Sequence, residues 1–215
     1  MPWPELEPRQ FPAFEKELDG ISKKTMDEHY KLYATYISKT NECRKLLDDV
    51  DWNEAEGNQV YSYTRGIAID YTFALLGYKN HELYFGHLGG EGGEPNGRFA
   101  ELMEQEMGLE SWKHAVRVAA MNARGWVMVG YDLNDGSLFN YHLDSQNLFA
   151  VYNMVPVLAI DVFEHAYAGD FGGSSAGRQE YLEAFFRNLD WDHVNRQVEQ
   201  AEAAGLALSD RALVE

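Results

Sequence analysis

The sequence predicts an α+β fold, with a long antiparallel α-hairpin at the N-terminus followed by a three-stranded antiparallel sheet surrounded by helices. Two long segments near the N-terminus carry apolar residues at helical spacing. A glycine-rich stretch at residues 89–95 then interrupts the chain, and strand-like segments separated by a turn signal follow it. These three observations place the helical hairpin before the break and the sheet after it.

The N-terminal half is predicted to be an extended arm followed by two helices. Residues 1–20 form the arm, because prolines at positions 2, 4, 8 and 12 oppose regular structure. Ser22 offers an N-cap for a first helix over residues 23–49, and a second helix is predicted over residues 60–86 after a short polar turn. Two helices joined by a short link pack antiparallel, so residues 21–91 are assigned to a helical hairpin domain.

Residues 92–200 are predicted to form an α/β C-terminal domain, and residues 201–215 a C-terminal tail. Asn134-Asp135-Gly136 is a hairpin-turn signal between two strand-like segments. The last helix is expected to end near residue 203, which leaves a short tail after Gly205. The elements predicted here are strands over residues 126–131, 138–143 and 155–161 and helices over residues 98–105, 110–122, 177–189 and 192–203.

Composition and charge exclude several classes of protein. Acidic residues number 35 against 18 basic ones, and the net charge of −17 argues against nucleic acids and anionic membrane surfaces as partners. The single cysteine, Cys43, leaves no intrachain disulfide and no cysteine-rich metal site. No apolar run reaches the roughly 18–20 residues that a membrane span needs, and the N-terminus lacks the features of a signal peptide. We therefore expect a cytoplasmic protein.

Three of the seven histidines have positions that point to a metal site. His29 and His81 lie in the first and the second predicted helix, where an antiparallel hairpin can bring them face to face. Asp161 ends the buried strand, and a carboxylate there is costly unless it is paired or binds a cation. His165 follows four residues later. Three imidazoles and one carboxylate suit manganese or iron, and zinc is compatible with the same ligands.

These residues lie in motifs that resemble those of the iron/manganese superoxide dismutases. Residues 161–167, Asp-Val-Phe-Glu-His-Ala-Tyr, are similar to the family signature Asp-Val-Trp-Glu-His-Ala-Tyr. Residues 21–29 resemble the start of the family's first helix, and residues 80–85 resemble its second histidine motif. Gly-Gly-Glu-Pro at residues 92–95 matches the segment between the family's two lobes. The resemblance extends over nearly the whole chain.

The resemblance implies a superoxide dismutase, which converts superoxide to dioxygen and hydrogen peroxide by redox cycling of one bound ion per subunit. It implies four metal ligands: His29, His81, Asp161 and His165. Tyr36 corresponds to the tyrosine at the mouth of the substrate funnel, and Gln146 to the glutamine that hydrogen-bonds metal-bound solvent; both are expected to serve catalysis. Manganese is the first choice of metal and iron the second, because the iron type usually carries this glutamine at the position of Gly77.

The resemblance further implies a homodimer whose subunits meet in the region of Glu164 and His165, and an aromatic side chain beside the metal at Trp126. Superoxide is an anion, so a local cluster of positive charge is expected to attract it to this acidic protein. Lys31 and Lys79 are the candidates, because they lie near the two histidine-bearing segments.

The spacing of two site residues departs from the family pattern. From His29 to Tyr36 the chain is one residue shorter than in the family, and one residue changes the direction of a helical side chain by about 100°. A match without a gap, counted back from Tyr36, would make Glu28 the ligand. His29 is preferred because the residues before it match in order and the family ligand is an imidazole.

The gateway of the substrate funnel is also altered. Leu32 or Tyr33 stands where the family has a histidine, Ala168 replaces the tyrosine that pairs with it, and Phe163 replaces the signature tryptophan. These changes leave open a metalloenzyme of the same fold that acts on a larger organic substrate, because fold and ligands alone do not fix the reaction. A non-catalytic homologue is a third hypothesis, although such a protein would be expected to lack ligands.

Overall fold

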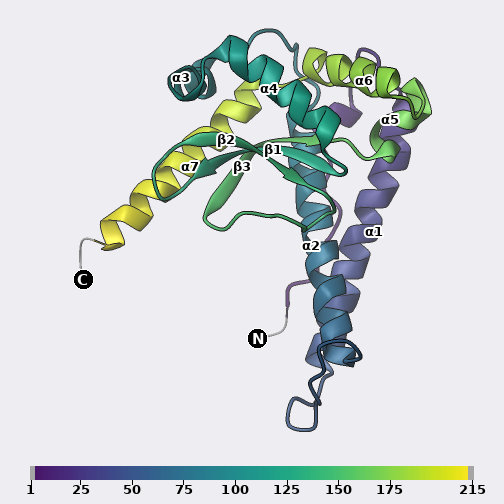
Figure 1. Ribbon diagram of the computed structural model, residues 1–215. Helices are drawn as coiled ribbons and strands as arrows, with labels where there is room; N and C mark the ends of the chain where they lie inside the picture. Colours follow the sequence, from purple (N-terminus) through teal and green to yellow (C-terminus); the bar gives the residue numbers. More distant parts are fainter. Residues whose placement is uncertain (1–2, 213–215) are drawn as a thin grey trace.

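The computed structural model describes residues 3–212, in which a pair of long helices lies beside a three-stranded sheet covered by further helices (Figure 1). A 3₁₀-helix, η1, spans Pro12–Phe14, and the hairpin consists of α1 (Lys23–Asp48) and α2 (Tyr63–His87). The elements after the hairpin are α3 (Gly97–Glu106), α4 (Leu109–Asn122), β1 (Trp126–Asp132), β2 (Leu138–Leu143), β3 (Met154–Asp161), α5 (Glu164–Phe171), α6 (Ser175–Arg187) and α7 (Trp191–Ala212). None of the helices in this part of the chain is both long and apolar enough to cross a membrane.

α1 and α2 pack side by side and form the predicted hairpin (Figure 1). Both helices begin at a serine N-cap: the side chains of Ser22 and Ser62 each accept a hydrogen bond from a backbone N–H of the first turn. α1 continues without interruption for 26 residues. Its buried face carries apolar side chains at helical spacing, among them Met26, Tyr33 and Ile37. Local capping and burial of one face therefore explain the first helix.

The sheet has the order β2-β1-β3 and is antiparallel throughout, as predicted. β1 is the central strand, and its first residue, Trp126, lies opposite Leu143 of β2 on one side and Asp161 of β3 on the other. All residues of β1 before Asp132 are buried. α7 packs against β1 and β3, and α4 packs against β1 and β2. Helices thus cover the sheet, and the predicted α+β class is confirmed.

The two halves of the chain meet where α2 packs against β3 and α1 packs against α5. Asp161 is the last residue of β3 and is completely buried at this junction. The junction therefore brings side chains from α1 and α2 together with side chains from β3 and α5, which follow much later in the sequence. It is the place where the candidate site forms.

Two elements differ from the prediction. α5 is a separate helix that the sequence pattern does not predict, because its eight residues bury only Ala166 and Tyr167 and give little periodic signal. α7 continues to Ala212, through most of the segment predicted as a tail. Gly205 is buried inside this helix, where a Cβ atom would lie 3.6 Å from the ring of Tyr131. Gly205 therefore lies within the helix and against the sheet, and it does not end the helix.

Candidate metal centre

The four predicted ligands form one cluster at the junction. One donor atom from each of His29, His81, Asp161 and His165 lies within 4.8 Å of the others. The Oδ2 atom of Asp161 is 3.1 Å from Nε2 of His29 and 3.0 Å from Nε2 of His165. Nε2 of His81 lies 3.7 Å from the same oxygen. The first three side chains are completely buried, whereas that of His165 is 30% exposed.

The shorter spacing in α1 keeps two site residues on one face of the helix. Seven residues are close to two turns of a regular α-helix, so His29 and Tyr36 point in nearly the same direction. Their rings lie 4.9 Å and 5.4 Å from the ring of His81, measured between centroids. Glu28 is exposed on another face. The helix therefore presents His29 to the cluster, and the match that would have placed Glu28 there is wrong.

The cluster fits a metal cation because the ring nitrogen of His81 that faces Asp161 has no hydrogen-bond partner. Nδ1 of His81 lies 2.6 Å from the carbonyl oxygen of Gly77, which can only accept, so Nδ1 carries the proton and Nε2 carries a lone pair. Nε2 is buried without a hydrogen-bond partner and faces the carboxylate of Asp161. Two electron-rich atoms facing each other in a dry site favour a cation between them. Three imidazole nitrogens and one carboxylate oxygen are a suitable donor set for iron or manganese.

The pKa shifts of His29, His81 and Asp161 favour the forms that bind a metal ion, whereas that of His165 favours its protonated ring in the metal-free site. Burial lowers the pKa of His81 to about 3, with further repulsion from His29, and burial also lowers the pKa of His29. Burial opposes ionisation of Asp161, but His165 and His29 hold the pKa of this carboxyl well below its usual value. Burial works against the charge on His165 as well, yet Asp161 raises its pKa. Neutral imidazoles and an ionised carboxylate are the ligand forms that metals require.

Gln146 lies beside the cluster and is held in one orientation. It is buried, its Oε1 atom accepts a hydrogen bond from Nε1 of Trp126 at 3.0 Å, and its Nε2 atom donates to the hydroxyl of Tyr36 at 3.2 Å. The side chain of Asn80 donates to the backbone oxygen of Gln146 at 2.9 Å. Gly77 makes room for this arrangement, because a Cβ atom there would come within 2.7 Å of the Tyr36 ring. The structure thus brings the two predicted catalytic residues together.

Other residues that position the cluster were not assigned a role from the sequence. The hydroxyl of Tyr181 donates to the backbone oxygen of Asp161 at 2.7 Å, so its oxygen accepts from the hydroxyl of Tyr84 at 3.2 Å. The ring of Tyr84 lies 5.0 Å from that of His29. Tyr84 follows His81 by three residues on α2, and this spacing is the signal that places it on the same helix face.

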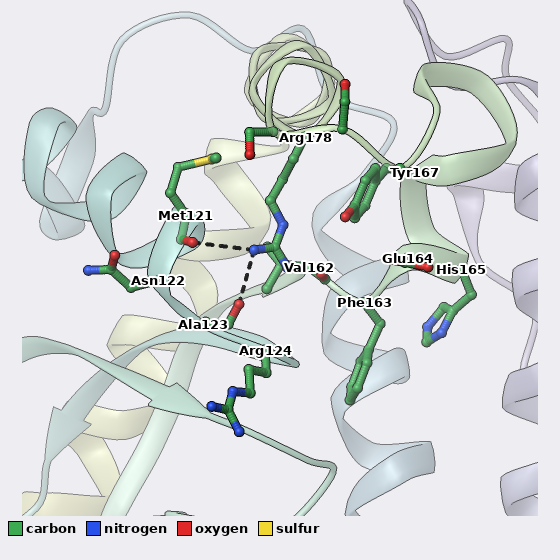
Figure 2. Close-up of a pocket in the computed structure, with 13 residues that line it drawn as sticks. Met121, Asn122, Ala123, Arg124, Val162, Phe163, Glu164, His165, Tyr167 and Arg178 are labelled. Atoms are coloured by element: carbon green, nitrogen blue, oxygen red, sulfur yellow. Dashed lines mark hydrogen bonds between the residues drawn. The ribbon is translucent and has the colours of Figure 1, made fainter.

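A cavity of 710 Å³ adjoins the cluster on its exposed side (Figure 2). His165, Glu164 and Phe163 line it, and the ring of Phe163 is stacked on that of His165 with centroids 5.3 Å apart. Arg178 closes another wall: its guanidinium donates to backbone oxygens of Val162 and Ala123, and to that of Met121. His165 can therefore be reached from the protein surface through this cavity.

Several residues proposed for the substrate channel lie elsewhere. Tyr33 is buried one turn after His29 on α1, where its hydroxyl donates to Oε1 of Glu82 at 2.9 Å and accepts from the backbone N–H of Arg9. The hydroxyl of Tyr33 is thus bonded to α2 and to the N-terminal arm, and to none of the four cluster residues. Lys79 lines a separate cleft that contains none of the four cluster residues.

Comparisons with known proteins agree with this geometry. Residues 95–197 match the family model described as iron/manganese superoxide dismutases, C-terminal domain. The chain is 36% identical over 200 residues to superoxide dismutase (Fe) of Aquifex pyrophilus, an alignment that covers 91% of this chain and 92% of the relative. It is 35% identical to superoxide dismutase (Fe) of Aquifex aeolicus (strain VF5), with the same coverage of 91% and 92%. It is 30% identical over 184 residues to superoxide dismutase (Mn) 1 of Halobacterium salinarum, covering 84% of this chain and 88% of the relative. The chain therefore belongs to the iron/manganese superoxide dismutase family.

Proposed function

We propose that the protein is a superoxide dismutase that holds one manganese or iron ion between His29, His81, Asp161 and His165. The observation that carries the proposal is the convergence of these donors around the unpartnered Nε2 atom of His81. When bound, the metal supplies one-electron redox chemistry by alternating between its trivalent and divalent states. The protein supplies the protons and the shape of the site.

Tyr36 and Gln146 are proposed to deliver and orient protons for the formation of hydrogen peroxide. Because the amide of Gln146 donates to the Tyr36 oxygen, the hydroxyl proton of Tyr36 is left to point elsewhere, toward the site. Burial, and then the charge of Asp161, raise the pKa of Tyr36, so its hydroxyl stays protonated at neutral pH. The hydrogen bond from Trp126 prevents the amide from turning over, because Oε1 must face the indole N–H.

Manganese is proposed as the first choice of metal and iron as the second. Gly77 contributes no side-chain amide from α2, so the amide close to the cluster is that of Gln146, which comes from the loop after β2. Relatives of both metal types match the chain. Metal analysis of the protein purified from cells grown with both metals tests this choice.

A homodimer that covers the cavity beside His165 is also part of the proposal. Two observations support a second subunit at this surface. The side chain of His165 is 30% exposed, and the neighbouring Glu164 is exposed as well. Light scattering coupled to gel filtration tests the dimer. We further propose that the protein works in the cytoplasm, which the single buried thiol of Cys43 supports.

The activity is tested by superoxide decay with protein reconstituted separately with manganese and with iron, beside a metal-free control. Metal-dependent decay that His81→Ala or Asp161→Ala abolishes is the expected result. Fully loaded protein that leaves superoxide untouched would overturn the proposal. No observation in the site favours an organic substrate over superoxide.

A further inference from the structure

A second cleft, of 570 Å³, lies between the N-terminal arm, α2 and the start of α7. It shares no lining residue with the cavity beside the metal cluster. Four basic side chains line it: Arg9, Lys16, Lys79 and Arg196. The whole chain carries 35 acidic and only 18 basic residues, so this cleft reverses the overall sign of charge locally.

The two carboxylates in this cleft are already engaged. Oε2 of Glu82 pairs with the guanidinium of Arg9 at 3.2 Å, and its Oε1 atom accepts from a buried tyrosine hydroxyl. Oδ1 of Asp190 accepts from the backbone N–H of His193 at 3.0 Å and so caps the start of α7. Glu82 is therefore paired with Arg9, whereas Asp190 keeps its charge, and the four basic side chains still outnumber the two carboxylates.

The other three basic side chains of the cleft have hydrogen-bond donors without a partner among the described residues. Within the described part of the chain, Lys79 and Arg196 have neither an ion pair nor a side-chain hydrogen bond. Lys16 donates to the carbonyl oxygen of Gly89 at 2.5 Å, which satisfies one donor but leaves the charge. Cations elsewhere are commonly paired with carboxylates, as are Lys23, Lys39, Arg98, Lys113, Arg117 and Arg187.

His193 adds a polar side chain to the wall of the cleft, and one of its ring nitrogens can accept a hydrogen bond. Its ring packs against the bare backbone of Gly86, where a Cβ atom would lie 2.9 Å from Nε2. Behind it, 5.2 Å away between centroids, lies His87, which is buried without a hydrogen-bond partner on either ring nitrogen. Burial lowers the pKa of His193, and Arg196 lowers it further. Lys79 and Arg196 therefore remain the cations of the cleft that are not paired with a carboxylate or held by a hydrogen bond, within the described residues.

We infer that this cleft binds an oxyanion of the phosphate class, held chiefly by Arg196 and Lys79. A guanidinium offers paired donors that match phosphate oxygens, and an ammonium adds a point charge. The distant carboxylates of the acidic protein do not prevent binding, because charges more than about 8 Å away are largely screened at physiological ionic strength. The volume lies within the usual range for small-molecule sites. It exceeds the size of one phosphate ion, so a phosphate ester also fits.

The test is calorimetric titration of the metal-loaded protein with inorganic phosphate, with AMP and with adenosine. Arg196→Gln removes one donor pair, and its expected effect is a loss of affinity of about tenfold or more. Arg65→Gln is the matched control, since Arg65 is an exposed arginine at the opposite end of α2. Arg196→Lys is expected to recover part of the affinity, because it restores the charge but not the paired donors.

A second readout is the melting temperature of the metal-loaded protein. Phosphate is expected to raise it for the natural protein and for Arg65→Gln, but not for Arg196→Gln. Tighter binding of AMP than of phosphate, without binding of adenosine, would identify an ester as the ligand; equal binding would identify the free ion. Equal affinities in all three arginine variants, or no binding of either phosphate probe, would overturn the inference.

Discussion

The hydroxyl of Tyr36 is fixed by one amide, that of Gln146, beside the buried ring of His81. We expect Tyr36→Phe to slow superoxide decay by about tenfold or more, because positioned proton donors contribute roughly 10²–10⁴-fold. The metal content is expected to stay unchanged, since Tyr36 is not among the four clustered donors. Stopped-flow decay and metal analysis on the same samples check this.

Tyr30→Phe is the control on the same helix, because the hydroxyl of Tyr30 bonds the backbone oxygen of Arg9 at an exposed position. It is expected to leave the decay rate unchanged. Full activity in Tyr36→Phe would exclude a role for this hydroxyl in proton supply.

The position of the Tyr36 ring also depends on the lack of a side chain at Gly77. A Cβ atom there would lie 2.7 Å from the Tyr36 ring, so Gly77→Ala is expected to displace the ring and to lower the free energy of unfolding by about 1–3 kcal/mol. Gly66→Ala, at an open position on the same helix, is expected to raise it by about 0.5–1 kcal/mol. Urea unfolding of both variants measures the difference. Equal changes in the free energy of unfolding for the two variants would mean that the Tyr36 ring moves aside at little cost.

Which residues could be predicted from the sequence depends on how local their interactions are. His29, His81, Asp161 and His165 stand in recognisable motifs, and the structure brings all four together. The bonds that Asn80 and Trp126 make to Gln146 cross 66 and 20 residues, so no local pattern reports them. The bonds of Tyr33 could not be predicted for the same reason. Its position depends on Glu82 and on the N-terminal arm, which meet it only in the folded protein.

At the level of elements, α1 shows why spacing must be considered together with helix geometry. The missing residue between His29 and Tyr36 does not disturb the site, because an uninterrupted α-helix brings residues seven apart onto one face. Apart from the end of α7, helices and strands that bury a periodic face were predicted to within a few residues. α5 was not, because a helix of eight residues is too short to show a clear period.

α7 offers a prediction at the same scale. Gly205 lies inside the helix, and a Cβ atom would make ordinary contacts of 3.6 Å and 3.8 Å with Tyr131 and Leu133. Gly205→Ala is therefore expected to stabilise the protein by roughly 0.5–1 kcal/mol, by reducing the freedom of the unfolded chain. Gly172→Ala is the opposite case, since its φ of +71° disfavours any side chain. Thermal unfolding should shift upward for the first variant and downward for the second.

The stability of the whole molecule depends on pH through a histidine outside the metal cluster. Burial, with repulsion from His193, holds the pKa of His87 well below its value of 6.5 in an unfolded chain. As the pH falls, the unfolded chain takes up this proton first. His87 therefore imposes no loss above pH 6.5, and below it stability falls by up to about 1.4 kcal/mol per pH unit.

Replacing His87 with leucine isolates this effect, because every other titrating group is common to both proteins. Urea unfolding of the metal-loaded proteins between pH 5 and pH 7 is expected to show a shallower decline for His87→Leu. Parallel declines would assign the acid sensitivity to other groups.

The cluster joins residues 132 positions apart, since His29 lies near the start of the chain and Asp161 in the last strand. Contacts between such distant residues form late in folding, because long loops must close before they are made. A ribosome must therefore release most of the chain before the site exists. Metal acquisition is then one of the final steps of maturation, and the ion is chosen from those surrounding a chain that is already nearly folded.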